Sequence, residues 1–361
     1  MTTIRENLAA LPERKALVRA VLGPNLRGKR DKTLVSAYKR LKPGSDGRIH
    51  TGLSVATTSG RLASSNTITE ESGTNLQNLS NKIATLDQLY HTRDILRADR
   101  GFHLITRDFS SAEALLCFAY AEDWEWVEIL RRGESMHGLH AKEFFGLTCP
   151  ADQVKKLYPE TYTTSKNLTF LSLYLGGART ATVTFNKDFP IHGQRITERE
   201  VARIQGILYE LHTLKEWWAN VEDQLERDKG TIINCFGQAR PLRDPDKHSR
   251  LKDALSYLPQ STVAWLMNQA VVRVHDELDK AEEIELLHQV HDEICLQSRP
   301  EHVDRTLAAT KRIMETTFVV RGKRIHIPTE AGMGPLSGSW GQVEKVKGVL
   351  RQQESPKSFE S

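Results

Sequence analysis

Three residues with cationic or aromatic side chains recur at four-residue intervals in the run SKNLTFLSLYLGG, which spans residues 165–177. They are Lys166, Phe170 and Tyr174. An α-helix turns about 100° per residue, so steps of four keep all three on one face. Such a face could hold a phosphate at its cationic end and stack a flat base on its rings. The pattern also fits a core helix whose lysine reaches solvent, so the run alone leaves both interpretations open.

Two segments that contain aspartate flank this run. Asp108 lies between a strand-like sequence, His103 to Arg107, and a helical pattern that starts at Ser110. Asp292 lies at the tip of a predicted β-hairpin from Ile284 to Ser298. Carboxylates at such positions are well placed to hold metal ions that prefer oxygen ligands. A tight turn also favours aspartate for backbone reasons, so the hairpin alone does not indicate a metal site.

Length, charge and composition limit which classes of protein fit the sequence. A length of 361 residues suggests two or three domains, and a net charge of +4 permits a nucleic-acid partner without requiring one. The four cysteines are far apart, which excludes a zinc knuckle or a CxxC motif and fits a reduced intracellular protein. No apolar run is long enough for a membrane span, and the first residues lack the apolar core of a signal peptide. We therefore expect a cytoplasmic protein, in the host cytoplasm if it is viral, with no membrane partner.

Several segments, in this order along the chain, resemble motifs of the family A DNA polymerases, the group of bacterial polymerase I and many phage replicases. Residues 108–113 (DFSSAE) resemble motif A, Lys166, Phe170 and Tyr174 resemble motif B, and residues 291–293 (HDE) resemble motif C. The segments SGRL (59–62), NLQN (75–78) and GSWG (338–341) also have counterparts. The resemblance covers roughly Gly47 to Gln342. Each motif is weak alone, but their shared order is a strong signal.

The resemblance implies an α+β fold, the right-hand polymerase fold with an antiparallel palm sheet and helical fingers. The implied regions are a helical, basic thumb remnant (1–46), a first palm segment with motif A (47–121), fingers with motif B (122–248), a second palm segment with motif C (249–345) and a disordered tail (346–361). Family members usually carry a longer thumb and often an exonuclease domain ahead of the palm. We therefore expect the thumb to be largely missing and a second polypeptide to supply a thumb and exonuclease; a truncated gene or degenerate remnant is the alternative.

The resemblance also implies catalytic roles. Asp108, Asp292 and the backbone carbonyl of Phe109 would bind two Mg²⁺ ions, and Glu293 is a weaker third carboxylate candidate. Such ions lie about 3.5–4 Å apart and stabilise the charge of a transferring phosphate. Lys166 would contact the β- and γ-phosphates and could protonate the leaving pyrophosphate.

Nucleotide contacts follow from the same motifs. Glu113 would close the space of a ribose 2′-hydroxyl and so select deoxynucleotides. The spacing Ser110-x-x-Glu113 also matches a helix capping box, and both roles could hold together. His137 would help to bind the triphosphate, and Phe170 and Tyr174 would bracket the base and sugar.

Primer–template contacts are implied for seven residues. Four of them would lie near the minor groove, where every base pair offers acceptors. Another would touch DNA in the fingers, one would contact DNA near the primer end, and one would position the primer terminus. In that order they are Arg61, Asn75, Gln77 and Asn78, then Arg240, Gln260 and His291.

The sequence departs from motif B at one position that matters for phosphate binding. Tyr162 stands where the family has an arginine, which removes a bidentate phosphate donor. Lys155 and Lys156 are nearby in the sequence, but nothing in the sequence shows that they compensate. An arginine restored at position 162 is expected to improve triphosphate binding, unless another cation already fills this role.

The sequence therefore predicts a DNA-templated DNA polymerase that adds deoxynucleotides to a primer 3′-hydroxyl by two-metal-ion phosphoryl transfer. A non-catalytic, polymerase-derived DNA-binding subunit of a split polymerase is the alternative. The Tyr162 position and the short N-terminal region favour this alternative, and the two aspartates argue against it. A single-subunit RNA polymerase lacks a gate like Glu113 in the family pattern, and a reverse transcriptase would carry a Tyr-x-Asp-Asp hairpin, which is absent.

Overall fold

The structure is a computed structural model that describes residues 48–65, 75–79, 83–84, 89–90, 92–188, 195–279 and 283–346. The predicted thumb remnant and the predicted tail beyond Val346 lie outside these ranges. The described chain forms two compact units. The sheet unit contains the described residues up to Phe109, Met267–Met314 and those from Thr329 onward, and the helical unit contains Ser110–Leu266 and Glu315–Pro328. The division into thumb, palm and fingers by residue range stays a prediction.

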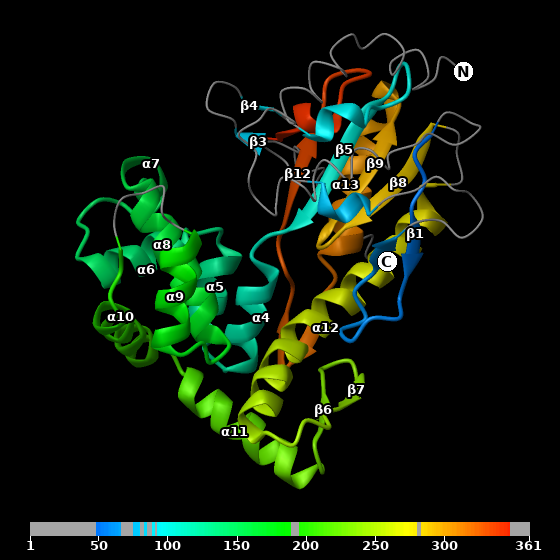
Figure 1. The fold of residues 1–361 in the computed structure, drawn as a ribbon. Helices are drawn as coiled ribbons and strands as arrows, with labels where there is room; N and C mark the ends of the chain where they lie inside the picture. The colour runs from blue at the N-terminus through cyan, green and yellow to red at the C-terminus, as the bar shows by residue number, and fades with distance from the viewer. Residues whose placement is uncertain are drawn as a thin grey trace, which may run out of the picture. The chain divides into compact units, whose positions relative to one another are not determined.

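A five-stranded antiparallel sheet organises the sheet unit (Figure 1). Its strand order is β13 (Glu344–Lys345), β12 (Thr329–Met333), β5 (His103–Phe109), β9 (Glu293–Ser298) and β8 (Ile284–Val290). The predicted strand before Asp108 is therefore confirmed as the central strand. Since both neighbours of β5 are distant from it in sequence, only the folded chain brings their side chains together.

Alternation along the strands gives the sheet two buried faces. On one face, the Arg107 guanidinium donates to Thr310 Oγ1 at 2.9 Å and to the Leu307 carbonyl at 2.8 Å, both on helix α13 (Val303–Met314). The other face packs into a core of apolar residues from five segments. This core contains Leu76, Leu79, Ala98, Phe102, Leu104, Val290, Cys295 and Trp340.

The hairpin of β8 and β9 forms as the sequence predicts. Val290 pairs with Glu293, so His291 and Asp292 make a two-residue turn. His291 has φ of 57°, in the left-handed region that such a turn requires and that non-glycine residues seldom adopt. The side-chain amide of Gln289 donates to the His291 carbonyl, which holds the turn from within.

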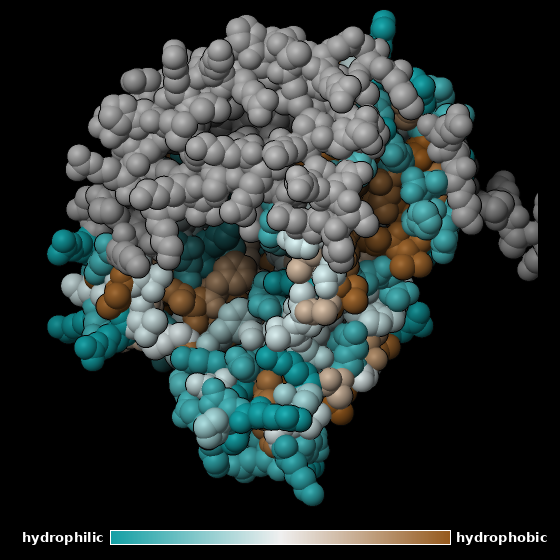
Figure 2. Space-filling view, turned by 45° about the vertical axis from the view of Figure 1, so that its right-hand side comes forward, coloured by the Kyte–Doolittle hydropathy of each residue, from teal (hydrophilic) through white to brown (hydrophobic). Residues whose placement is uncertain are grey.

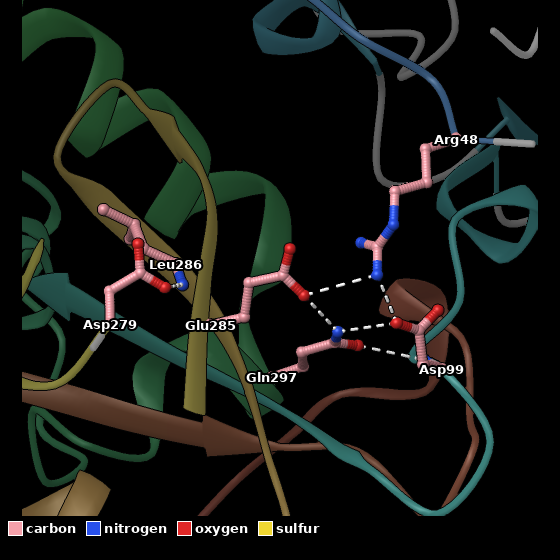
Figure 3. A network of polar contacts seen from close by, with 6 residues as sticks. All are labelled: Arg48, Asp99, Asp279, Glu285, Leu286 and Gln297. Carbon is pink, nitrogen blue, oxygen red and sulfur yellow. Dashed lines mark hydrogen bonds and ion pairs between the residues drawn. The ribbon is translucent and has the colours of Figure 1, made fainter. Parts of the chain in front are cut away.

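The sheet unit also contains several short strands and 3-10 helices. They are β1 (Gly52–Ser54), β2 (Ala63–Ser65), η1 (Leu76–Asn78), β3 (Ile83–Ala84), β4 (Leu89–Tyr90), η2 (Thr92–Ile95), η3 (Pro300–His302) and η4 (Trp340–Gln342). Figure 3 shows the polar network that ties the start of this region to β8 and β9. Arg48 pairs with Asp99 and with Glu285, and the Gln297 amide donates to both carboxylates, at 2.9 and 2.6 Å. Because these ion pairs are partly exposed, they orient the segment more than they stabilise it.

Helices make up most of the second unit. They are α4 (Ala112–Tyr120), α5 (Trp124–Arg131), α6 (Met136–Phe145), α7 (Val154–Leu157), α8 (Pro159–Leu173), α9 (Ala178–Asp188), α10 (Glu198–Leu211), α11 (Leu214–Arg227) and, up to residue 266, α12 (Lys247–Glu277). Two hairpins accompany them, β6 (Thr231–Ile233) with β7 (Ala239–Pro241) and β10 (Phe318–Val320) with β11 (Lys323–Ile325). The first hairpin turns near Gly237, whose φ is 78°.

Local signals explain the helix boundaries in this unit. Pro159 occupies the first turn of α8, where its missing N–H costs nothing. Thr197 and Glu200 form a reciprocal capping box at the start of α10. Amphipathic α11 buries Leu214, Trp217, Val221 and Leu225. In Figure 2 the lowest part of the view, which holds α11 and the β6–β7 hairpin, is mainly hydrophilic with isolated apolar patches. No helix in the described part of the chain is both long and apolar enough to span a membrane.

Candidate functional site

Two carboxylates meet at one end of the sheet unit. Asp108 is the penultimate residue of β5, and Asp292 is the second residue of the β8–β9 turn. The Phe109 amide donates to the Asp292 carbonyl at 3.1 Å, which joins the end of the strand to the turn. Sheet register adds two further acids, because Asp108 lies opposite Glu293 on one side and Glu330 on the other. The structure thus brings together the two aspartates that the sequence singled out.

Burial and neighbouring acids raise the pKa values of the two aspartates at this end of the sheet. Burial, followed by the charges of Asp292, Glu293 and Glu330, raises the pKa of Asp108 to about 8. Burial also raises the pKa of Asp292, against the lowering effect of Arg61 and His291. Because the two carboxylates repel each other, the ionised form of each is less favourable than in an isolated aspartate unless a cation lies nearby.

These residues fit a divalent cation with oxygen ligands. The Asp108 Oδ1 atom is buried and has no hydrogen-bond partner, so it is an acceptor that lacks a positive counterpart. Among the described residues, no group of three or more His, Cys, Asp or Glu side chains is arranged to hold a metal ion. Mg²⁺ suits such a sparse site, because it commonly binds one or two carboxylates and completes its shell with waters and substrate phosphates.

Glu293, the third carboxylate candidate, has a cationic neighbour that sequence reasoning missed. Its carboxylate lies 3.9 Å from the guanidinium of Arg93, which stacks 3.8 Å above the ring of Trp340. Burial lowers the pKa of Arg93 and raises that of Glu293. No motif marks Arg93, since its partners come from β9 and from the distant GSWG segment. A metal-binding role for Glu293 stays a prediction.

The predicted minor-groove residues lie in the same unit but differ in their surroundings. The Gln77 amide is engaged within the protein: its Oε1 accepts from the Ser64 amide at 3.1 Å, and its Nε2 donates to the Leu62 carbonyl at 3.0 Å. Arg61 is half-buried and close enough to Asp292 to lower its pKa. Asn75 has a buried Oδ1 without a hydrogen-bond partner, and the Asn78 side chain lies outside the described set. Their DNA contacts stay predictions.

In the helical unit, the predicted face of residues 166, 170 and 174 belongs to α8 and its end. Lys166 is exposed, and Phe170 is half-buried one turn later. Tyr174 is the C-cap residue, with φ of −109° and ψ of 34°. The three residues therefore come from one segment, although the last leaves the helix.

Glu113 is hydrogen-bonded to two side chains of the helical unit and does not form the predicted capping box at the start of α4. Its Oε1 accepts from the Tyr174 hydroxyl at 2.6 Å and from the Gln260 amide at 3.1 Å. The capping box expected from Ser110 to Glu113 is wrong, because α4 starts at Ala112 with Ser111 as its N-cap, one residue later than the box requires. Three predicted site residues are therefore joined directly, and Glu113 is held by a tyrosine and an amide.

His137, on α6, packs over the same face of α8. Its ring lies edge-on to Tyr162 with centroids 5.7 Å apart, and 5.6 Å from the Phe170 ring. Burial, with the nearby charge of Lys166, lowers the pKa of His137 to about 4. The imidazole is therefore neutral at pH 7, so any phosphate contact it makes is a hydrogen bond rather than an ion pair.

A series of buried hydrogen bonds connects α8 to neighbouring helices. His140 contacts Thr169 Oγ1 and His212 Nε2, each at 2.9 Å, and His212 Nδ1 contacts Asp123 at 2.7 Å. Thr169 is adjacent to Phe170, so these hydrogen bonds tie α8 to α6 and to the end of α10. Nothing in the local sequence links these four residues, which is why sequence reasoning missed them.

The remaining predicted DNA contacts divide between the two units. In the helical unit, Arg240 lies on β7, 4.0 Å from Asp253 and 5.5 Å from the centroid of the Tyr257 ring. In the sheet unit, His291 is exposed at the hairpin tip. Neither contact with DNA is tested by this geometry.

Comparison with solved structures identifies the fold. The chain superposes with a TM-score of 0.69 on the POL domain of Pol1 from M. smegmatis, a structure in complex with DNA primer-template and dNTP. The match covers 87% of this chain and 51% of that one, at 21% sequence identity. At that identity the likeness shows the fold, a polymerase-domain fold of mixed α+β class, and confirms the fold class that the motifs predict.

Sequence comparison identifies the family. The model of DNA polymerase family A matches residues 1–342, and the chain belongs to this family. It is 26% identical over 338 residues to the thermostable DNA polymerase I of Thermus thermophilus, covering 91% of this chain and 37% of that protein. DNA polymerase I of Deinococcus radiodurans is 27% identical over 302 residues, covering 80% and 28%. The chain thus spans about a third of the length of these curated relatives.

Proposed function

We propose that the chain is a DNA-directed DNA polymerase that extends a primer 3′-hydroxyl with deoxynucleotides. The observation that carries the proposal is the pair of facing carboxylates, Asp108 and Asp292, with a buried acceptor oxygen that lacks a partner. Family membership supports the same activity. Primer–template DNA and deoxynucleoside triphosphates are the proposed partners.

In the proposed mechanism, Asp108, Asp292 and the Phe109 carbonyl would hold two Mg²⁺ ions. Bound there, the ions supply positive charge that makes the primer hydroxyl more acidic and stabilises the transferring phosphate. Both aspartates must be deprotonated to act as ligands, because ligating carboxylates bind as anions. Lys166, exposed on α8, provides a mobile cation and proton donor for the leaving pyrophosphate.

Sugar selection is proposed for Glu113. A carboxylate that accepts hydrogen bonds from Tyr174 and Gln260 has a fixed position. A fixed carboxylate can exclude a ribose 2′-hydroxyl by occupying its space, whereas a mobile one would move aside. The aromatic rings of Phe170 and Tyr174 are the proposed stacking surfaces for the base and sugar.

A non-catalytic DNA-binding subunit is the second candidate function. Retention of two neighbouring, half-buried aspartates argues against it, since a subunit without catalysis has no use for acids whose burial costs stability. A partner polypeptide that supplies a thumb and exonuclease stays a prediction. Its test is running-start extension at rising salt, where short products from the chain alone support the partner and long products contradict it.

Primer extension by the purified chain tests the main proposal. A labelled primer on a template, all four deoxynucleotides and Mg²⁺ should give template-directed products, and chelation of Mg²⁺ should abolish them. Binding of the primer–template without any extension across a range of Mg²⁺ and Mn²⁺ concentrations would favour the non-catalytic candidate.

A further inference from the structure

The row of side chains beside α8 contains a second cation that comes from a different helix. Lys155 lies on α7, and its Nζ atom is 5.8 Å from the centroid of the Tyr162 ring. A lysine ammonium within about 6 Å of an aromatic ring face is attracted by the negative charge of that face. Tyr162 thus holds the ammonium of Lys155 at the position in α8 where the family pattern has an arginine.

The joint between α7 and α8 fixes this arrangement. Tyr158 is both the C-cap of α7 and the N-cap of α8, and its amide donates to the Val154 carbonyl at 2.7 Å. The Tyr162 amide in turn donates to the Tyr158 carbonyl at 2.9 Å. A single residue therefore joins the two helices, so their backbones hold Lys155 and Tyr162 in register.

The rest of the row places a second lysine along α8. Tyr162 contacts His137, and His137 contacts Phe170, so the rings form a continuous surface. Lys166 lies one helical turn from Tyr162, a rise of about 6 Å. Both lysines are exposed, whereas His137 carries no charge at pH 7. Lys155 and Lys166 therefore both place positive charge beside these rings, at two points along an aromatic surface.

We propose that Lys155 is a triphosphate-binding residue that replaces the missing motif B arginine, with Tyr162 as its positioning residue. The inference rests on the proposed function, because it assigns a contact to the nucleotide of that reaction. A lysine offers three N–H donors on a point charge, and it lacks the planar fork of arginine. Lys155 therefore adds affinity for the triphosphate through its charge. It does not select for a pair of phosphate oxygens in the way that the two parallel N–H groups of arginine can.

Equilibrium binding separates Lys155 from general surface charge. The full chain, bound to primer–template with a dideoxy terminus, is titrated with the matching deoxynucleoside triphosphate and with the uncharged deoxynucleoside. Lys155→Ala should weaken triphosphate binding about tenfold, the size of one charge-assisted contact, and leave nucleoside binding unchanged. Lys156→Ala is the matched control, since Lys156 is equally exposed on the same helix, and it should stay within about twofold.

Replacing Tyr162 tests how the contact is built. Tyr162→Leu removes the ring and should lower triphosphate affinity about as much as Lys155→Ala, whereas Tyr162→Phe keeps the ring face and should change little. Tyr162→Arg should restore binding in the Lys155→Ala background and add little to the unmodified chain. This cross-rescue is a readout that loss of folding cannot imitate.

The outcomes separate the inference from the proposed function. Equal effects of Lys155→Ala and Lys156→Ala, in a chain that extends primers, would overturn the role of Lys155 alone. Equal losses for triphosphate and nucleoside would do the same, because they would indicate a disturbed fold. A chain that binds no triphosphate and extends no primer would overturn the proposed function and this inference together.

Discussion

The two candidate sites carry opposite kinds of unbalanced charge. In the sheet unit, burial and the charges of neighbouring acids raise the pKa of Asp108 to about 8. In the helical unit, two lysines stand beside aromatic rings, and a neighbouring imidazole has a pKa of about 4. The acid set is costly as it stands, because like charges and burial both oppose ionisation of Asp108, whereas the two lysines are exposed to solvent. The sheet unit is suited to cations and the helical unit to anions.

The two sites also differ in how they are built. Each acid beside Asp108 comes from a different strand or turn, so its place depends on sheet register. The aromatic and cationic residues come mainly from one helix and its immediate neighbour. A register error would therefore disperse the acids, whereas the helical face would survive as long as α8 forms. This contrast suggests four ways to test it.

The largest effect is expected from removing a charge in the acid pair. Asp108→Asn or Asp292→Asn should lower the rate of nucleotide addition by roughly a thousandfold or more, because the metal ions lose an anionic ligand. Primer–template affinity should change little. Single-turnover extension and equilibrium DNA binding measure the two quantities.

Glu330→Gln is the matched control for this pair. Glu330 also lies beside Asp108, but it is ion-paired with Lys345, so it is not a proposed ligand. This variant should keep activity within about tenfold. Full activity in either aspartate variant would contradict the two-metal assignment.

The next effect concerns sugar selection in the helical unit. Glu113→Ala should raise the efficiency of ribonucleotide incorporation relative to deoxynucleotide incorporation by roughly 10- to 100-fold, since a space-filling carboxylate is lost. Tyr174→Phe, which removes one hydrogen bond to Glu113, should shift the same ratio by a smaller factor. An unchanged ratio in a folded Glu113→Ala protein would leave Glu113 with a structural role only.

A third test measures the stability of the metal-free chain, where a substitution of a proposed metal ligand is expected to stabilise the fold. The folded-state pKa of Asp108 lies above its ordinary value of 3.8, so the folded state binds a proton more tightly than the unfolded state does. The free energy of unfolding should therefore fall as pH rises from about 4 to about 8 in metal-free protein. Asp108→Asn should flatten this fall and stabilise the metal-free chain at pH 8 by on the order of 1–2 kcal/mol.

Denaturant unfolding at pH 5 and pH 8 measures this difference. Adding Mg²⁺ should stabilise the unmodified chain at pH 8 and narrow the gap to the variant, because a bound cation replaces the proton. A variant less stable than the unmodified chain at pH 8 would show that the acid pair is compensated within the protein.

The smallest effect is expected from a buried histidine. Burial, followed by the charge of Arg93, lowers the pKa of His288 to about 4, and its ring packs edge-on against Trp340 at 4.6 Å. Between pH 6.5 and 4 the unfolded state binds a proton that the folded state does not, so stability should fall as pH falls through this window. His288→Phe should reduce that fall by about 1 kcal/mol, with no added pH dependence above pH 7. An unchanged slope would assign the acid sensitivity to other groups.

Much of the local structure could be predicted from the sequence. The strand before Asp108, the hairpin tip at Asp292 and the α8 helix all form where the sequence indicates. Each rests on a short-range signal, such as apolar periodicity, turn residues or a proline at the first helical turn. The wrong prediction of a capping box at Ser110 and Glu113 also concerns local structure. The sequence fits a helix that starts after Ser110, but α4 has Ser111 as its N-cap.

The order of residues along the chain was enough to identify which side chains could do chemistry, and family motifs in a shared order pointed to a polymerase. Folding added the neighbours of those side chains: Glu330 beside Asp108, Arg93 beside Glu293, and Tyr174 and Gln260 on Glu113. Lys155 and Tyr162 are close in sequence, but their contact also depends on the joint between α7 and α8. Periodicity reports on neighbours within a few residues, whereas sheet register and helix packing join residues tens to hundreds of positions apart. Charge and pKa at a site depend on those distant neighbours, so they emerge only when the chain is folded.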